Sequence, residues 1–158
     1  MKRPALFLIV LLVFATASRG DVWLTDFAAA QERARREDKP MLLNFSGSDW
    51  CGWCIRLNNE VFSTPAFITF ATQRFVCVLI DSPRRTPLPE ALAAQNRALK
   101  QRFEVPGFPT ILLTTPEGKT LARTGGYRAG GPQAYVDHLD QLLRLSKEPS
   151  PAPTEDQP

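Results

Sequence analysis

Two cysteines, Cys51 and Cys54, lie close enough in the sequence to act as a chemical pair. At the start of a helix, this spacing lets the two side chains reach each other across the first turn. Unpaired backbone N–H groups and the positive end of the helix dipole favour a thiolate there, so we expect Cys51 to be the better nucleophile. Such a pair suits thiol–disulfide exchange, in which Cys51 attacks a disulfide and Cys54 resolves the mixed disulfide.

The flanking sequence predicts the elements that position this pair. Residues 41–45 form an apolar run typical of a buried strand, and a helix would continue from Cys51 through Glu60. Further strands are expected at 23–24, 75–80, 110–114 and 119–123, the last one broken by Gly125-Gly126. Further helices are expected after Asp26, after Ser63 or Thr64, at 90–103 and at 132–145. This order predicts an α/β fold with a mixed central β-sheet and helices on both faces.

A second motif lies far along the chain. Residues 105–110 read Val-Pro-Gly-Phe-Pro-Thr and lead into an apolar strand. Together with the strand, the Trp-Cys-x-x-Cys motif and the helix, this pattern resembles the thioredoxin superfamily over roughly residues 23–145. It is similar to secreted bacterial thioredoxin-like proteins and to the C-terminal domain of the periplasmic thiol:disulfide interchange protein. The resemblance implies a thioredoxin fold.

The resemblance also implies further site residues. The Phe108-Pro109 bond is expected to be cis and to lie against the cysteines, where its backbone would pair with a substrate strand. Gly126 matches a family glycine near the substrate groove. We expect Gly52 to let the backbone turn closely and Trp53 to form an apolar rim for partner proteins, with shielding of the disulfide as the alternative role of Trp53. The predicted substrate-binding residues are Trp50, Gly52, Trp53, Phe108, Pro109 and Gly126.

Some positions depart from the family pattern. Asn44 stands where the family places a buried aspartate that moves a proton to or from the resolving cysteine, and asparagine cannot act as a general base. We therefore expect slower resolution, or a water in that role. Ile55 replaces a lysine that often follows the motif, and Arg56 is expected to supply positive charge. Asp49 and Glu60 are expected at the surface.

The first residues predict export. Lys2 and Arg3 precede an apolar stretch at 6–14, and Ala15-Thr16-Ala17 follows, which is typical of a cleaved secretory signal peptide. An uncleaved membrane anchor is the alternative, although a spanning helix needs about 20 apolar residues. We predict a signal peptide at 1–17, a thioredoxin-like domain at 18–146 and a disordered Pro-rich tail at 147–158. The mature chain would be periplasmic or secreted, without stable membrane insertion.

Composition argues against other classes of function. Cleavage would remove Lys2 and Arg3 from a chain of formal charge +3, and the sequence shows no basic stripe or motif for nucleic acid. The single histidine, His138, is expected at the surface or at the end of the last helix. Cys77 lies within an apolar strand and is expected in the core. Without a second cysteine pair or a nearby histidine, we expect no metal site and no organic cofactor.

These patterns lead us to predict an exported thiol:disulfide oxidoreductase that exchanges disulfides with cysteines of other proteins. We favour the reducing direction, because Trp-Cys-Gly-x-Cys resembles reducing relatives more than oxidising ones. Its electrons would come from an exported or membrane thiol carrier. The main alternative is a peptide-binding or chaperone-like module of the same fold, whose disulfide Cys51–Cys54 is only structural. A metal-handling role is a third hypothesis.

Overall fold

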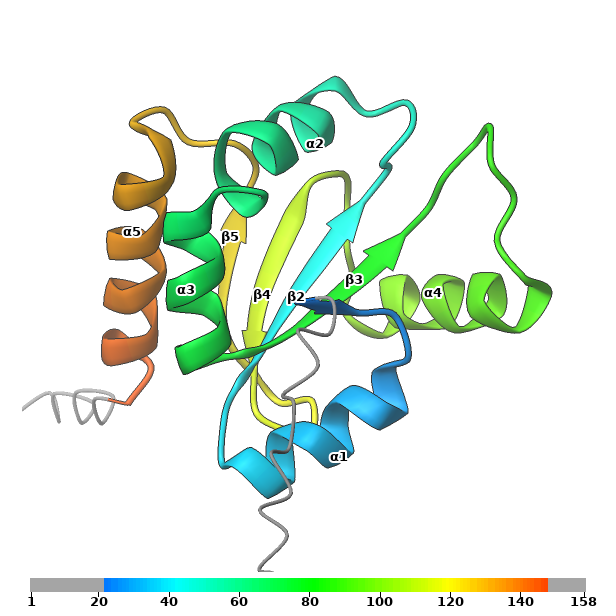
Figure 1. The fold of residues 1–158 in the computed structure, drawn as a ribbon. Coiled ribbons are helices and arrows are strands. Elements are labelled where there is room, and N and C mark those ends of the chain that lie inside the picture. Colours follow the sequence, from blue (N-terminus) through cyan, green and yellow to red (C-terminus); the bar gives the residue numbers. More distant parts are fainter. Residues whose placement is uncertain (1–21, 148–158) are drawn as a thin grey trace, which may run out of the picture.

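A mixed five-stranded sheet forms the centre of the molecule, with strand order β1-β3-β2-β4-β5 (Figure 1). β2 pairs parallel with β3 and antiparallel with β4, while β1 and β5 form the edges. The strands are β1 (Trp23–Leu24), β2 (Met41–Ser46), β3 (Val76–Asp81), β4 (Thr110–Thr114) and β5 (Thr120–Gly125). The computed structural model describes residues 22–147. The signal peptide predicted at 1–17 and nearly all of the tail predicted at 147–158 lie outside the described residues.

Helices cover both faces of the sheet, as the sequence predicted (Figure 1). They are α1 (Phe27–Glu37), α2 (Gly52–Leu57), the π-helical turn η1 (Asn58–Phe62), α3 (Pro65–Arg74), α4 (Glu90–Arg102) and α5 (Gly131–Leu145). Phe67 of α3 and Leu139 of α5 belong to the core on one face, and Phe27 of α1 and Leu99 of α4 to the core on the other. Within residues 22–147, no helix combines the length and the apolar character needed to cross a bilayer.

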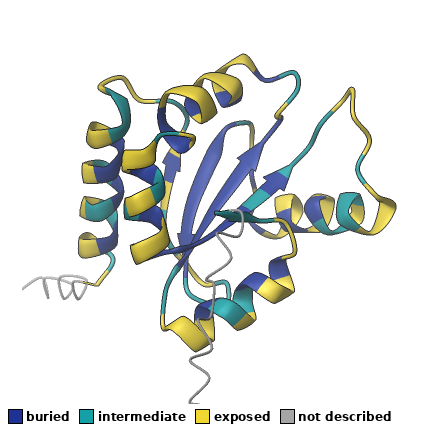
Figure 2. Cartoon of the chain, in the orientation of Figure 1, coloured by how far each residue is buried: buried dark blue, intermediate teal, exposed yellow. Residues whose placement is uncertain are grey.

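The central strand β2 is buried along its whole length (Figure 2). Leu42 packs into the core beneath α3 and α5, and Leu43 packs into the core beneath α1 and α4. A strand covered on both faces reads as a continuous apolar run, which is why residues 41–45 lack polar alternation. The chain leaves this strand at Ser46 and enters α2 six residues later, so the two cysteines lie at the carboxyl end of the central strand.

Local rules of helix initiation account for α1 and α3. The side chain of Asp26 accepts a hydrogen bond from the backbone N–H of Ala29 at 3.0 Å, which caps α1. Thr64 caps α3 in the same way, and Pro65 occupies the first helical turn, where its missing N–H costs nothing. Both predicted helix starts are confirmed.

The structure differs from the sequence prediction at two element ends. The helix predicted to run through Glu60 widens after Leu57 into the π-helical turn η1, where the adjacent Val61 and Phe62 are both buried. The wider turn brings two consecutive side chains into the core, which a regular helical stripe does not favour. The other difference concerns β5, which extends beyond residue 123 to Gly125, and the next residue, Gly126, has a φ of 50°.

Candidate active site

Cys51 and Cys54 form a disulfide at the start of α2. Cys51 is the N-cap residue of α2, its backbone N–H donates to the carbonyl of Gly47 at 2.9 Å, and its sulfur accepts from the N–H of Cys54 at 3.2 Å. The exposed fraction is 8% for Cys51 and 4% for Cys54. Both cysteines are therefore buried in the oxidised protein.

Pro109 and Gly126 lie together beside the disulfide-bearing segment. The Phe108-Pro109 peptide bond is cis, as predicted. The N–H of Gly126 donates to the carbonyl of Pro109 at 3.1 Å, which joins the start of β4 to the end of β5. A cavity of about 320 Å³ opens here, and its lining consists of Trp53, Phe108, Pro109, Gly126 and Tyr127. Four of the six predicted substrate-binding residues therefore share one cavity, and Tyr127 is a lining residue that sequence reasoning missed.

Trp50 and Gly52, the other two predicted residues, do not line this cavity. The Trp50 ring packs edge-on against Phe108 at 5.9 Å between centroids, and its indole N–H donates to the carbonyl of Ser82 at 2.8 Å. Gly47 lies under this ring, where a Cβ would come within 2.6 Å of it. Gly52 has an ordinary φ and open space around it, so the close turn expected there does not require glycine.

Trp53 forms the exposed wall of the cavity, with 58% of its surface accessible. Its ring stacks on Tyr127 at 5.7 Å between centroids, and the Arg56 guanidinium lies 4.4 Å from the centre of the Tyr127 ring. Glu60 accepts hydrogen bonds from the Tyr127 hydroxyl and from Arg56, and these bonds hold the pKa of the Glu60 carboxyl below its usual range. Glu60 thus offsets the charge of Arg56, and the two side chains hold the stacked rings of Trp53 and Tyr127 in place.

Asp49 connects the cysteine segment to the loop at 82–89. Its carboxylate accepts hydrogen bonds from three consecutive backbone N–H groups, those of Arg84, Arg85 and Thr86, at 2.9, 2.7 and 3.0 Å. These donors, that of Arg84 first, lower the pKa of Asp49. Asp49 is thus a partly exposed surface residue, as predicted, but its hydrogen-bond partners lie on a loop that only the tertiary fold brings near.

The lowered pKa of Asp49 predicts a pH-dependent contribution to stability. A carboxyl with a depressed folded-state pKa stabilises the protein above its unfolded value of about 3.9, and the contribution is lost as pH falls through the folded pKa. We expect Asp49→Asn to lower the melting temperature at pH 7 and to have little effect near pH 2. Thermal unfolding at both pH values tests this, with the exposed Glu32→Gln as a control. An equal loss at both pH values would contradict the ionic role.

Within residues 22–147, neither Asn44 nor His138 forms a hydrogen bond to Cys51 or Cys54. Asn44 is buried on β2, and its Oδ1 has no hydrogen-bond partner within the described residues. His138 bonds to Thr124 Oγ1 at 2.9 Å from the middle of α5, not from its end as one alternative had it. Burial lowers the pKa of His138, which favours the neutral imidazole.

Cys77 is a core residue, as predicted. It is 2% exposed in the middle of β3, and burial raises the pKa of its thiol to about 12. Since the thiolate is the reactive form, this cysteine is inert at neutral pH. Within residues 22–147, no group of three or more His, Cys, Asp or Glu side chains is placed to hold a metal ion.

Comparisons with known proteins point to one family. A family model described as a thioredoxin-like domain matches residues 27–142. The disulfide bond reductase DsbH of Chlamydia pneumoniae is 37% identical over 119 residues, which cover 75% of this chain and 71% of DsbH. The thioredoxin-related protein DsbJ of the same organism is 33% identical over 129 residues, 78% of this chain but only 37% of DsbJ. A solved structure of a DsbH oxidoreductase has a TM-score of 0.73 at 36% identity, covering 78% of this chain and 84% of that one.

Proposed function

The chain belongs to the family of thioredoxin-like domains, and from this membership we propose that it is a thiol:disulfide oxidoreductase that reduces disulfides in other exported proteins. The observation that carries the proposal is the placement of the Cys51–Cys54 disulfide at the start of α2, in the segment whose Trp53 lines a cavity with Pro109. A relative named a disulfide bond reductase, DsbH, supports the reducing direction. The signal-peptide pattern at 1–17 supports export to the periplasm or beyond.

The proposed reaction has two exchange steps. In the reduced protein, the Cys51 thiolate attacks one sulfur of a partner disulfide, forms a mixed disulfide and releases the first partner thiolate. The Cys54 thiolate then attacks the Cys51 sulfur, forms the Cys51–Cys54 disulfide and releases the second partner thiolate. Two electrons pass to the partner, and the released thiolates take up protons from solvent. Because Asn44 has no acidic proton to exchange, a water is the proposed proton carrier at the second step.

The site residues have separate proposed roles. The backbone beside Pro109 pairs with an extended partner segment next to the disulfide, and the cavity lined by Trp53, Phe108 and Gly126 receives a side chain of that segment. The Trp50 ring packs against the Phe108 ring and supports it. An exported or membrane thiol carrier restores the dithiol, and the chemistry requires no organic cofactor.

The reduction potential of the Cys51–Cys54 pair tests the direction. Thiol trapping in graded redox buffers would measure it, with Cys77→Ala removing the third thiol without placing a hydroxyl in the core. We expect a value near the thioredoxin end of the known range, about −270 mV, which favours electron donation. A value near about −120 mV would reverse the direction. A pair that never reduces reversibly would instead support the redox-inert peptide-binding module.

A further inference from the structure

A cationic side chain lies over each of three aromatic rings near the disulfide. The Arg84 guanidinium lies 3.6 Å from the centre of the Trp50 ring. The Lys100 ammonium lies 4.9 Å from the centre of the Phe108 ring, and Arg56 covers Tyr127 as described above. We call the rings of Trp50, Phe108 and Tyr127 the aromatic frame. The three cations come from the loop after β3, from α4 and from α2, so three separate elements place positive charge on this frame.

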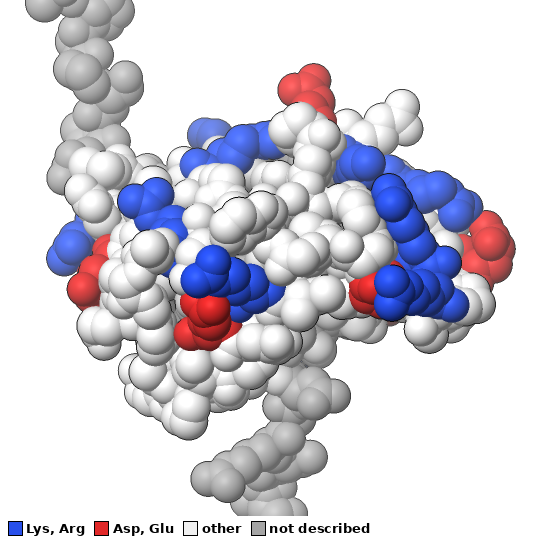
Figure 3. All heavy atoms as spheres, turned by 90° about the horizontal axis from the view of Figure 1, so that it is seen from above, with Lys and Arg blue, Asp and Glu red and all other residues white. Residues whose placement is uncertain are grey.

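Two of these cations have no carboxylate partner within the described residues. Arg56 is paired with Glu60, whereas neither Arg84 nor Lys100 forms a salt bridge. The acidic Asp49 nearby is occupied by backbone N–H groups. Figure 3 looks onto the end of the molecule that carries α2, where Lys and Arg side chains border a largely uncharged centre and outnumber the carboxylates. The aromatic frame around the disulfide therefore presents two cations, Arg84 and Lys100, that form no ion pair within the described residues, while the Asp49 carboxylate keeps its own charge.

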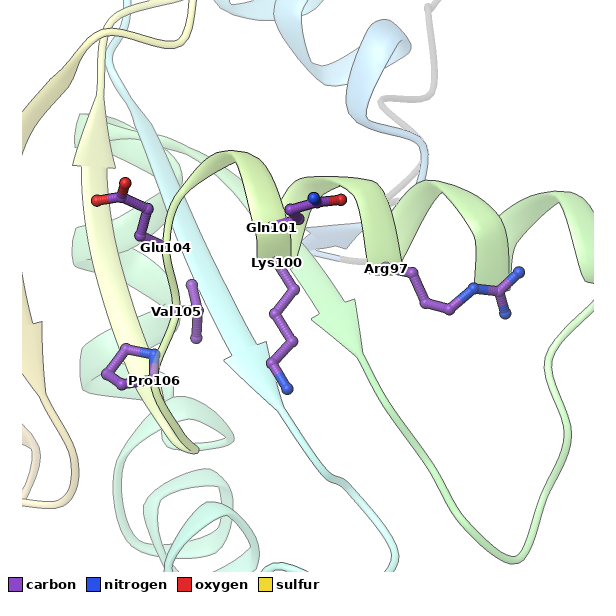
Figure 4. Close-up of a pocket in the computed structure, with 6 residues that line it drawn as sticks. All are labelled: Arg97, Lys100, Gln101, Glu104, Val105 and Pro106. Carbon is purple, nitrogen blue, oxygen red and sulfur yellow. The ribbon is translucent and has the colours of Figure 1, made fainter.

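The geometry keeps both cations available to a ligand. The Arg84 guanidinium lies over the Trp50 ring, and its N–H groups donate no hydrogen bond within the described residues, so they can donate to a carboxylate of a ligand. Asp49 fixes the backbone of Arg84, which lowers the entropy lost on binding. Lys100 also lines a second cavity of about 450 Å³ beside Val105 and Pro106. Figure 4 shows the Lys100 side chain pointing toward the end of the sheet where β2 ends, while the Glu104 side chain points the opposite way.

We propose that the partner presents its disulfide on an acidic segment of polypeptide. An apolar side chain next to the partner cysteine fills the cavity between Trp53 and Phe108, and Asp or Glu residues on either side of it pair with Arg84 and Lys100. Opposite charge steers association and rejects partners of like charge. This inference rests on the proposed function and names the class of protein substrate for the same site.

Matched peptides test the charge preference. Each peptide contains one intramolecular disulfide and one leucine beside a cysteine, with two flanking positions occupied by Asp, Asn or Lys. Stopped-flow fluorescence measures the reduction of each peptide by the dithiol form of the full protein, and each rate is divided by that with uncharged dithiothreitol. We expect the Asp peptide to react about tenfold faster than the Lys peptide at low salt, with the ratio falling as salt screens the charges.

A pair of double variants tests whether Arg84 and Lys100 cause the preference for acidic peptides. Arg84→Gln with Lys100→Gln should reduce the Asp-to-Lys ratio to about twofold or less, because both proposed partners of the acidic residues are removed. The control Arg36→Gln with Lys147→Gln removes the same net charge from exposed positions on α1 and after α5, and it should keep the full ratio. Peptides that react equally, or a ratio unchanged in the frame variant, would overturn the acidic preference and leave the proposed function intact. If no peptide reacted, the proposed function itself would fail.

Discussion

Replacing Cys51 with serine is expected to abolish disulfide reduction, with a loss of about 1,000-fold or more in turnover. A hydroxyl at the N-cap of α2 keeps the capping position polar, but it is not ionised at neutral pH and cannot form a mixed disulfide. The measurement is the rate at which the full protein reduces a model protein disulfide with dithiothreitol as the terminal reductant. Because serine is similar in size to cysteine, the fold should survive the change.

Two companion variants make this test specific. Cys54→Ser keeps the proposed nucleophile but removes the resolving thiol, so a mixed disulfide with the substrate should accumulate and be visible on a non-reducing gel. Cys77→Ala removes the buried thiol of β3 and should leave turnover unchanged, since a thiol with a pKa of about 12 takes no part at neutral pH. Unchanged turnover in Cys51→Ser would contradict the enzyme proposal and favour the peptide-binding module with a structural disulfide.

Local sequence rules predicted most of the scaffold. The strand at Met41–Ser46 follows from an unbroken apolar run, and Asp26 and Thr64 follow from ordinary capping chemistry. The cis bond before Pro109 followed from a resemblance to a family and not from any local preference, because X–Pro bonds are trans in most sequences. The sequence alone is therefore enough to identify the two cysteines and the proline.

Contacts between distant segments account for what the sequence could not predict. Asp49 binds backbone N–H groups 35 to 37 positions away, and Arg84 stacks on Trp50 as a result of the same loop placement. No periodic pattern signals such contacts, because they depend on where the loop after β3 returns to the sheet. Tyr127 was missed for the same reason: it lines the cavity only because Gly126 follows β5 and turns the chain toward Trp53.

The π-helical turn links the disulfide segment to the core, and Phe62 is its anchor. Phe62 is 2% exposed, and its ring lies 5.1 Å from that of Trp23, 4.7 Å from that of Phe67 and 5.5 Å from that of Tyr135, measured between centroids. It is the last residue of η1, which directly follows α2, so it holds the helix that carries the cysteines against the sheet. Its packing therefore supports both the stability of the fold and the position of the site.

Phe62→Ala should lower the free energy of unfolding by about 3–5 kcal/mol, because it removes buried apolar surface and leaves a cavity among three aromatic rings. A loss of this size is a large part of the roughly 5–15 kcal/mol that stabilises a typical domain. Urea unfolding of the oxidised protein, with the Cys51–Cys54 disulfide intact, measures it.

Trp53→Ala provides the matched comparison for Phe62→Ala, because it removes an aromatic ring from the preceding helical segment at a position that is 58% exposed. Its loss of stability should be much smaller, since most of the Trp53 surface is already in contact with water. Its peptide-exchange rate should fall instead, because the cavity loses its exposed wall. Equal losses of stability in the two variants would contradict the anchoring role of Phe62. A large loss of stability in Phe62→Ala alone, together with slower peptide exchange in Trp53→Ala, would assign the two roles. Phe62 would then hold the site in place, and Trp53 would contact the partner.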